Sequence, residues 1–368
     1  MSKTIIIIGA GLAGLSAALQ AAENGCNVKL VSSLPSERAQ SVMAEGGINA
    51  ALNTKDENDS PEEHFTDTIK AACGLADPNA VWGMTQAAPE LVHWLLKLGV
   101  KFNMSGYDDV DLRNFGGQKK KRTAFAQSDT GKQIMTAMID AVRRKEASGM
   151  VERFSHHSFL TLRLCGNICC GCVIRDEYSQ ETVELPGDAV IVATGGMHGL
   201  FGNTTGSLSN TGEVTAELFR LGVPLANGEM IQYHPTTVKC GGKRMLISEA
   251  ARGEGGRLFA MKDGKQWYFM EEKYPELGNL MPRDITAREI WKVSHESEVF
   301  LDMTEISEEI ISNKLSGLAD DCMTYLHKDI RKEPVSVLPG IHYFMGGILV
   351  DEQHRTPIQN CLLYTSPS

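Results

Sequence analysis

The chain has 368 residues, of which 42% are hydrophobic, and its formal net charge is -10 at pH 7. This length suits a globular protein with two domains, and the acidic balance argues against nucleic acid, which requires a basic face. Because no window of about 18 apolar residues occurs and no apolar signal segment precedes the first strand, we expect neither a membrane span nor export, and therefore a cytoplasmic protein. An anionic substrate stays open, since a local cluster of arginines and histidines can outweigh a diffuse negative charge.

A strand, a helix and a second strand are predicted first, at Thr4–Ile8, Leu12–Asn24 and Asn27–Val31. The turn between the first two carries Gly9, Gly11 and Gly14 in the GxGxxG spacing. In this spacing the first glycine permits a tight turn, the second lets a pyrophosphate approach the backbone, and the third lets helix and strand pack closely. We therefore predict a bound dinucleotide. The usual ribose-binding acid is missing after the second strand, where Ser32 and Ser33 offer hydroxyl groups instead, so this turn alone leaves NAD and FAD open.

The segment "RAQSVMAEGGINAAL" (38–52) follows directly and shows neither a helical stripe nor a strand alternation. Such a glycine-paired, nearly uncharged segment is not a core helix. It is suited to lie flat against an extended ligand, with its backbone N–H groups free to bind it. We take it to favour FAD.

Two helices are expected next. The first has Ser60 as its N-cap and Pro61 at its first position, and the second presents an apolar face of Leu91, Trp94, Leu95 and Leu98. A third helix is predicted in "TGKQIMTAMIDAVRRKEASG". Residues 151–196 are rich in strand patterns and end in a glycine turn, "VATGG".

Nine cysteines are present, and four of them gather in "CGNICCGC", namely Cys165, Cys169, Cys170 and Cys172. An iron–sulfur or zinc site is one interpretation. The alternating pattern around the cluster favours instead a hairpin that turns at Gly166-Asn167, in which cysteine acts as a small hydrophobic residue. We therefore predict reduced thiols and no metal site.

From about Val238 the pattern changes to short strands and loops, with two helices expected around Ile285–Lys292 and Ile306–Asp329. A strand is predicted at Ile348–Val350. The last eight residues, "CLLYTSPS" (361–368), fit no pattern before them. We expect them to be a foreign tail that closes a truncated gene.

The segments "RAQSVMAEGGINAAL", "FGGQKKKRTAFAQSDTGK", "VATGG", "NTGE", "QYHPT", "SEAARGEGG", "MPRDITAR" and "HYFMGG" occur in this order along the chain. In this order they resemble the flavoprotein subunits of fumarate reductase and succinate dehydrogenase, over residues 4–358. The resemblance implies an α/β fold: a Rossmann-like FAD-binding domain, residues 1–237 and 343–360, with an α+β capping domain inserted at 238–342. It also implies that a further FAD segment, a substrate-binding arginine and a C-terminal helical domain are missing.

The FAD contacts implied by the resemblance are Gly9, Ala10, Gly11, Leu12, Ala13, Gly14, Ser32, Ser33, Gln40, Ser41, Val42, Met43, Ala44, Glu45, Gly46, Gly47, His157, Ser158, Phe159, Ala193, Thr194, Gly195, Gly196 and Glu213. Glu213 stands where the family has aspartate. Gln40 matches a histidine that carries FAD covalently in membrane-bound relatives, and an amide cannot form that bond. The resemblance therefore implies noncovalent FAD.

The catalytic residues implied by the resemblance are His234, His342, Ser248, Arg283, Glu249 and Arg252. The two histidines would bind substrate carboxylates, helped by the hydroxyl of Ser248, which replaces a threonine of the family. Arg283 would be the proton donor, supplied through the other two residues. The remaining cations, Arg288, Arg244 and the run Lys119–Arg122, are expected to be solvated or to steer substrate.

The function implied is FAD-dependent reduction of fumarate to succinate, or the reverse, by hydride transfer from flavin N5. L-aspartate oxidase, or a reductase of another unsaturated acid, is the alternative on the same scaffold. A non-catalytic flavin-binding redox partner and an iron–sulfur protein are alternatives of other classes. The expected partners are a dicarboxylate substrate and an iron–sulfur or other electron donor, which would hold the protein at the inner face of a membrane; no nucleic acid is expected.

Overall fold

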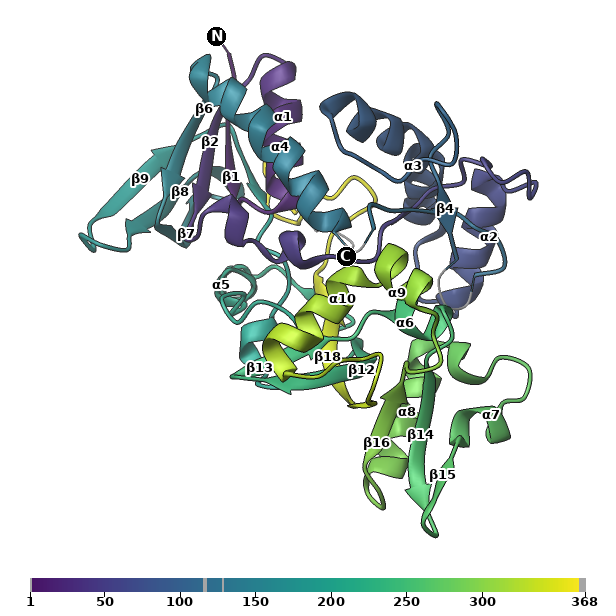
Figure 1. Cartoon of the computed structure of the whole chain (residues 1–368). Coiled ribbons are helices and arrows are strands. Elements are labelled where there is room, and N and C mark those ends of the chain that lie inside the picture. Colours follow the sequence, from purple (N-terminus) through teal and green to yellow (C-terminus); the bar gives the residue numbers. More distant parts are fainter. Residues whose placement is uncertain (1, 115–117, 128, 364–368) are drawn as a thin grey trace.

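In the computed structural model, which describes residues 2–114, 118–127 and 129–363, a five-stranded parallel sheet carries the N-terminal part of the chain (Figure 1). Its strands, in spatial order, are β20 (Cys361–Leu363), β10 (Ala189–Val192), β1 (Thr4–Ile8), β2 (Asn27–Ser32) and β6 (Val151–Ser155). Strand β1 reads as a continuous aliphatic run because both of its faces are buried. Ile7 faces a core with helices α1 (Leu12–Glu23) and α4 (Thr130–Ala147), whereas Ile6 and Ile8 belong to a second core.

The second core lies between this sheet and an antiparallel sheet of β7 (His157–Cys165), β8 (Ile168–Asp176) and β9 (Thr182–Pro186). The predicted hairpin at Gly166-Asn167 is confirmed, since Cys165 pairs with Ile168 directly across the turn. Among the described residues no group of three or more His, Cys, Asp or Glu is arranged to hold a metal ion.

The two helices predicted after residue 60 are α2 (Pro61–Ala71) and α3 (Pro78–Leu98). Ser60 caps α2 as predicted, accepting a hydrogen bond from the Glu63 amide at 3.2 Å. The predicted apolar face of α3 is wrong in part: Leu91 is 44% exposed, and the side that packs inward carries Val92 and Leu95. Two staggered apolar rows exist in this helix, and the periodicity alone did not show which row meets the core.

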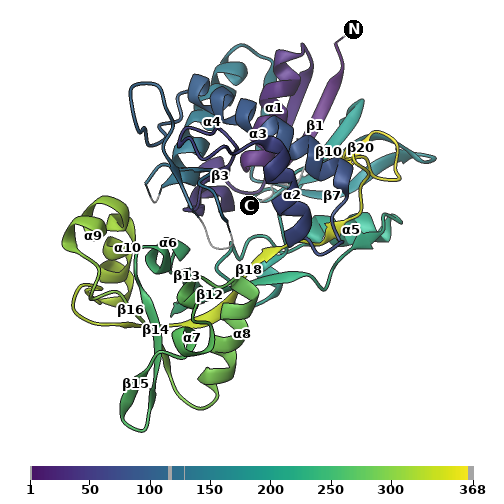
Figure 2. The ribbon, with the colours of Figure 1, turned by 90° about the vertical axis from the view of Figure 1, so that its right-hand side faces the viewer.

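The remaining elements divide between the two ends of the molecule (Figure 2). They are β3 (Ile48–Asn49), β4 (Leu112–Arg113), β5 (Thr123–Ala124), α5 (Glu213–Arg220), β11 (Leu225–Ala226), β12 (Ile231–Cys240), β13 (Lys243–Leu246), α6 (Glu249–Gly253), β14 (Arg257–Lys262), β15 (Lys265–Trp267), α7 (Phe269–Lys273), α8 (Arg283–Ser294), β16 (Val299–Asp302), α9 (Glu308–Lys314), α10 (Ser316–Asp321), β17 (Val335–Ser336), β18 (Leu338–Phe344) and β19 (Gly347–Ile348). Those with core residues between Ile247 and Val337 form the opposite end, whereas Ile48, Leu112, Ala124 and Leu218 pack into the two cores already described.

A separate hydrophobic core holds this end together and contains residues from Ile247 to Val337. The boundaries of a capping domain at 238 and 342 stay a proposal, because β12 and β18 pair with each other and run across both of them. The single helix expected at Ile306–Asp329 is wrong: the chain forms α9, then α10, then a π-turn at Cys322–Leu326. The strand expected at Ile348–Val350 is shorter and begins one residue earlier.

The last described residues correct the expectation for the tail. Cys361–Leu363 pairs in parallel with β10, and Cys361 and Leu363 are buried, so this stretch does have a partner. Residues 364–368 of the expected tail, and 115–117 and 128 of the motif "FGGQKKKRTAFAQSDTGK", lie outside the described residues. Within the described part of the chain, no helix has the length and apolar character needed to cross a membrane.

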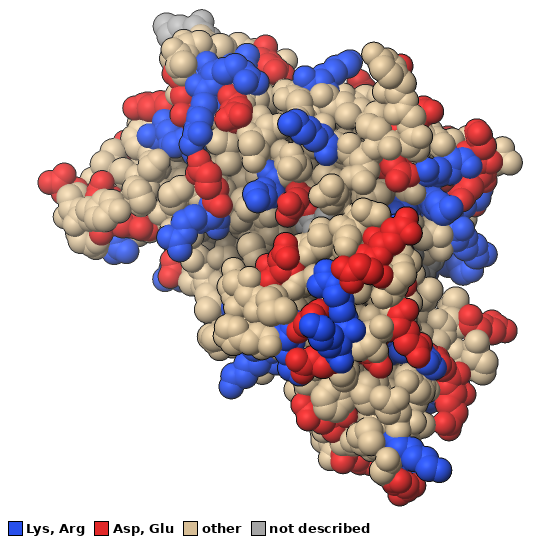
Figure 3. Space-filling view, in the orientation of Figure 1, with Lys and Arg blue, Asp and Glu red and all other residues tan. Residues whose placement is uncertain are grey.

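Acidic and basic side chains are interspersed over the face seen in Figure 3, as the modest net negative charge suggests.

Candidate active site

The turn between β1 and α1 depends on two glycines. Gly9 has φ +108°, and a Cβ atom there would lie 2.2 Å from the Ala193 carbonyl oxygen. A Cβ at Gly14 would lie 1.9 Å from the Gly9 carbonyl oxygen, so no larger residue fits between helix and strand. The N-cap of α1 is Gly11, which has no side chain with which to cap the helix. The positive end of α1 is therefore presented as an anion site, as a dinucleotide requires.

The segment 38–52 crosses in front of this turn. It forms a short 3-10 helix, Gln40–Met43, from which the Ser41 hydroxyl accepts a hydrogen bond from the Leu12 amide at 3.2 Å. Gly47, at φ +131°, lies so close to β5 that a Cβ would approach the Ala124 carbonyl oxygen to 2.4 Å. The segment is thus fixed between α1 and β5, and one side of it faces a cavity.

This cavity has a volume of about 2140 Å³ and reaches from the segment 38–52 to β12, α6, α8 and β18. Ligand sites commonly occupy roughly 300–1,000 Å³, so there is room for an extended dinucleotide and a second small molecule. The predicted FAD residues in its lining are Leu12, Gln40, Ser41, Met43, Ala44, Glu45, Gly46, Gly47, Thr194, Gly195 and Gly196. The glycine cradle, the N-terminus of α1 and the cavity together fit FAD.

The other predicted FAD residues lie outside this lining, and they are Gly9, Ala10, Gly11, Ala13, Gly14, Ser32, Ser33, Val42, His157, Ser158, Phe159, Ala193 and Glu213. Some of them still meet each other: the Ser33 hydroxyl lies 3.5 Å from that of Ser158. Glu213 begins α5 and is exposed, and the structure does not bring it to the cavity.

Five of the six predicted catalytic residues form one connected cluster, and Arg283 lies at its centre. Its Nε donates to Glu249 Oε2 at 2.9 Å, and its Nη1 donates to Gln232 Oε1 at 2.8 Å. Arg283 is the first residue of α8, and Pro282 before it fixes where the helix begins. Its side chain is 29% exposed and lines the cavity, whereas the Glu249 side chain is only 6% exposed.

Arg252 lies behind this pair, on the same short helix as Glu249. Its Nη2 is 3.5 Å from Glu249 Oε1, and its Nη1 donates to the Asn279 carbonyl oxygen. Its Nε has no hydrogen-bond partner in the described part of the chain. Burial lowers the pKa of this guanidinium, and the neighbouring Glu249 raises it. The cluster is thus a row of arginine, glutamate and arginine that leads from the buried protein into the cavity.

The two histidines come from the paired strands β12 and β18, and their rings lie 5.2 Å apart. His234 is buried, and burial holds its pKa well below the usual range. Burial also lowers the pKa of His342 to about 3, with the nearby Arg283 contributing. Both imidazoles are therefore neutral near pH 7. They can offer hydrogen bonds to a carboxylate, whereas positive charge must come from the arginines.

The orientation of His342 is fixed by residues that the sequence did not point to. The Thr205 hydroxyl lies 2.8 Å from His342 Nδ1, and His198 Nε2 lies 3.0 Å from the His342 carbonyl oxygen. When Thr205 donates to Nδ1, the ring proton is on Nε2.

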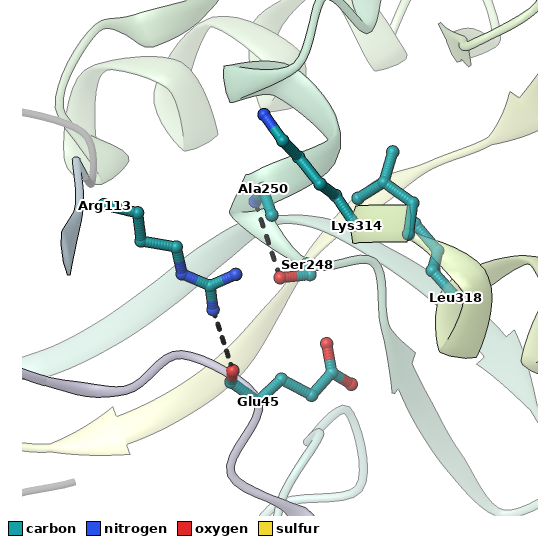
Figure 4. Close-up of a pocket in the computed structure, with 7 residues that line it drawn as sticks. Glu45, Arg113, Ser248, Ala250, Lys314 and Leu318 are labelled. Atoms are coloured by element: carbon teal, nitrogen blue, oxygen red, sulfur yellow. Dashed lines mark hydrogen bonds between the residues drawn. The ribbon is translucent and has the colours of Figure 1, made fainter. Parts of the chain in front are cut away.

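Ser248, the sixth predicted catalytic residue, caps α6 by accepting from the Ala250 amide at 3.4 Å. Figure 4 shows it in a small pocket opposite Glu45, with Arg113 alongside. Arg113 donates to the backbone carbonyl oxygen of Glu45 at 3.1 Å. Burial raises the pKa of Glu45 to about 7, helped by the charge of Asp321 on α10, while Ser248 and Arg113 oppose the rise. At this pocket the segment 38–52, through Glu45, therefore lies against the predicted catalytic residue Ser248.

Two of the cations expected to be solvated are buried, which corrects that prediction. Arg122 donates to both carboxylate oxygens of Asp59, at 3.1 and 2.8 Å. Arg244 donates to the Thr237 carbonyl oxygen at 2.9 Å and is buried against β12. Arg288 is exposed, as expected. The basic run by itself did not show which of its residues forms an ion pair with a carboxylate distant in sequence.

Gln232 was the most important residue missed, although it stands in the motif "QYHPT" two positions before His234. Both side chains line the cavity.

A family model described as FAD binding domain matches residues 4–363. The chain belongs to this family. FAD is therefore the dinucleotide of the glycine turn, and the predicted fold class is confirmed. The succinate dehydrogenase flavoprotein subunit of Bacillus subtilis is 43% identical over 97% of this chain and 62% of its own length. An L-aspartate oxidase of Nostoc is 33% identical over 96% of this chain and 60% of its own length.

Among solved structures, Escherichia coli quinol fumarate reductase FrdA matches 99% of this FAD-binding chain with a TM-score of 0.90 and 28% identity, over 64% of its own length. The predicted resemblance to this group of flavoproteins is thus confirmed. The chain spans less than two thirds of the length of these relatives.

Proposed function

We propose that this FAD-binding chain carries the active site of a fumarate reductase, which reduces fumarate to succinate or runs the reverse reaction. The observation that supports it most is the hydrogen-bonded pair of Arg283 and Glu249 beside two neutral histidines, in a cavity that the FAD segment also lines. A double bond flanked by carboxylates needs a hydride at one carbon, a proton at the other, and hydrogen-bond donors for both carboxylates.

Bound FAD would supply the hydride, held by the glycine turn and the segment 38–52. The proton would come from Arg283, whose side chain reaches the cavity. An arginine left deprotonated at pH 7 would cost at least ~7 kcal/mol, at about 1.4 kcal/mol per pKa unit. Glu249 and Arg252 would offset this cost by returning a proton to Arg283 as it donates one, and the contacts of Glu249 with both arginines support this role.

The substrate carboxylates would be bound by His234 and His342 as neutral hydrogen-bond donors, with the hydroxyl of Ser248 nearby. Because Arg283 and Arg252 carry the positive charge, the same cluster would both attract the substrate carboxylates and supply the proton. The proposed capping domain, residues 238–342, would also exclude water from the cavity while the hydride is transferred. The relatives named as subunits support a partner that supplies electrons, such as an iron–sulfur protein.

We expect the FAD to be bound noncovalently. Gln40 lines the cavity, and its amide can donate and accept hydrogen bonds but cannot form the bond of a histidine nitrogen. An acid-denatured sample run on a gel under ultraviolet light tests this. Free flavin in the supernatant is the expected result, and a fluorescent protein band would contradict it.

The L-aspartate oxidase of Nostoc favours the second candidate, oxidation of an amino dicarboxylate on the same scaffold. One comparison separates the two: fumarate turnover with reduced viologen as the electron donor, against peroxide production from L-aspartate in air. We expect fumarate to be reduced and aspartate to be left unchanged. Peroxide from aspartate, with no fumarate turnover, would replace the first proposal with the second.

A further inference from the structure

The four clustered cysteines divide into two pairs with different surroundings. Cys169 and Cys172 are buried in the core between the two sheets of the FAD-binding part. Cys165 is exposed and Cys170 is half-buried, and their Sγ atoms lie only 3.1 Å apart. The predicted core role of cysteine therefore holds for the first pair and leaves the second unexplained.

The backbone brings the second pair together. Gly166, at φ +65°, makes the turn between β7 and β8. Arg163 then pairs with Gly171 and Leu164 with Cys169, which leaves Cys170 as an extra residue on β8. An extra residue of this kind bends the strand and redirects a side chain. Ile168 lies opposite Cys165, and Cys170 stands two residues beyond it, so the alternation of β8 also puts both cysteines on one face of the hairpin.

We propose that Cys165 and Cys170 form a redox-active dithiol, which low-molecular-weight disulfides oxidise to an intramolecular disulfide. The two sulfur atoms need to approach by about 1 Å to reach a disulfide length of ~2.05 Å. They lie at a hairpin tip, where Cys165 is exposed and its side chain can move toward Cys170. A metal site does not explain the pair, because the described residues provide no third ligand.

The reaction consists of two thiol–disulfide exchanges. The thiolate of Cys165, the more exposed residue, attacks the small disulfide, forms a mixed disulfide and releases one thiolate. The thiolate of Cys170 then attacks the Cys165 sulfur, which forms the protein disulfide and releases the second thiolate. Two electrons pass from the protein to the small disulfide, and the two protons of the cysteine thiols end on the two released thiols.

The neighbourhood of Cys170 affects the second step. Contact with Cys165 raises the pKa of the Cys170 thiol, while the positive charge of Arg163 opposes this rise. When Cys165 is engaged in a mixed disulfide, its sulfur carries no negative charge, so this contribution to the raised pKa of Cys170 is removed. Closure of the ring is therefore favoured after the first exchange.

Oxidation has a structural consequence, because the hairpin tip also holds the chain that leads to β20. Asn167 Nδ2 donates to the Pro357 carbonyl oxygen at 2.9 Å, and the Cys169 amide donates to that of Gln359 at 2.8 Å. A disulfide between residues 165 and 170 encloses both Asn167 and Cys169. It would therefore fix the tip on which residues 357–359 are bound.

The experiment is equilibration of the chain in reduced and oxidised glutathione, acid quenching, alkylation and peptide mass analysis. The peptide 164–175 contains all four cysteines, and fragmentation locates any bond within it. We expect this peptide to lose two hydrogens in the parent, with a bond between Cys165 and Cys170. In Cys170→Ser the second exchange is blocked, so the glutathione adduct at Cys165 should accumulate at least about tenfold over the parent.

Cys73 serves as the matched control within the same sample. It is exposed, and its Sγ contacts the backbone carbonyl groups of Lys70 and Ala71. It should give only a glutathione adduct, equally in parent and variant. The proposal is overturned if Cys165 in the parent behaves like Cys73, if both cysteines of the pair are alkylated throughout, or if the disulfide joins other cysteines. The readout needs neither bound FAD nor turnover, so it does not depend on the proposed function.

Discussion

The two ends of the cavity are built in different ways. At the nucleotide end, the chain presents backbone: glycines that bring strand, helix and loop within contact, and a helix N-terminus whose N-cap is a glycine. At the catalytic end, it presents charged and polar side chains from β12, α6, α8 and β18, linked by hydrogen bonds. Distant segments meet at both ends: Gly9 lies against Ala193 at the first, and the central contacts of the second join residues 34 to 51 positions apart. What differs is that backbone atoms make the contacts at the first end and side chains make them at the second.

This difference teaches where each end is vulnerable. A backbone site is damaged by adding atoms, because there is no space for a Cβ. A side-chain site is damaged by removing atoms, because each charged group is satisfied by another. Substitutions of opposite kinds therefore separate the two ends.

The largest effect is expected at the catalytic end. Arg283→Ala should lower fumarate turnover by about 10²–10⁴-fold, the usual contribution of a general acid, while bound FAD stays unchanged. Lys292→Ala is the matched control, since Lys292 lies on the same helix, is 57% exposed and outside the cavity lining, and should leave turnover within about twofold. Steady-state rates with reduced viologen measure both. Equal losses in the two variants would mean that Arg283 only supports the helix.

At the nucleotide end, Gly14→Ala should reduce FAD content and destabilise the chain by about 1–3 kcal/mol or more, because the new methyl group would meet the Gly9 carbonyl oxygen. Gly83→Ala is the control, since Gly83 also lies in a helix but has no atom of the described chain within 4 Å of an added Cβ. That change should stabilise by roughly 0.5–1 kcal/mol. Flavin absorbance per chain and thermal unfolding test both, and normal FAD binding by Gly14→Ala would contradict the close-packing argument.

Glu45 belongs to the pocket where the two ends meet, and its raised pKa gives a pH dependence with a defined sign. The folded state holds a proton on Glu45 up to about pH 7, whereas the unfolded chain releases it near the ordinary value of 4.5. Stability from this group is therefore present at low pH and is lost as the pH rises from about 4.5 to 7. The loss has an upper bound of about 3 to 4 kcal/mol at ~1.4 kcal/mol per unit, and screening reduces it because the side chain is only half-buried.

Glu45→Gln should remove this loss, so its stability relative to the parent should increase between pH 4.5 and 7 and then level off. Chemical unfolding at a series of pH values measures the difference. Glu276→Gln, at an exposed position, is the control and should show no such trend. A constant difference between Glu45→Gln and the parent across this range would refute the assignment.

The smallest effect is expected from the residue that orients His342. Thr205→Val keeps the shape of the side chain but removes the hydroxyl beside Nδ1. Loss of one such hydrogen bond corresponds to ~0.5–1.5 kcal/mol, or about a two- to tenfold rise in KM for fumarate with bound FAD unchanged. Thr205→Ser, which retains the hydroxyl, should restore the parent value. A similar KM for both variants would show that the methyl group, and not the hydrogen bond, matters.

The glycine turn, the capped start of α2 and the hairpin at Gly166 could be predicted because each is specified by neighbouring residues. The catalytic residues could be named through a family resemblance, but their mutual contacts could not be derived from spacing. The buried face of α3, the break after α9 and the pairing of Cys361–Leu363 were misjudged. In each of these cases the outcome depends on what a distant element offers as a neighbour.

The sequence by itself determined where two backbone segments can come close together, because glycine has no Cβ and its position is visible in the sequence. The tertiary structure alone decided which charges are buried and paired. Arg122 and Lys119 stand in one basic run, yet Lys119 is exposed whereas Arg122 is buried in an ion pair with Asp59. Gln232 and Glu249 both meet Arg283 although separate strands and helices carry them. An ion pair depends on distance in space, and only folding sets that distance.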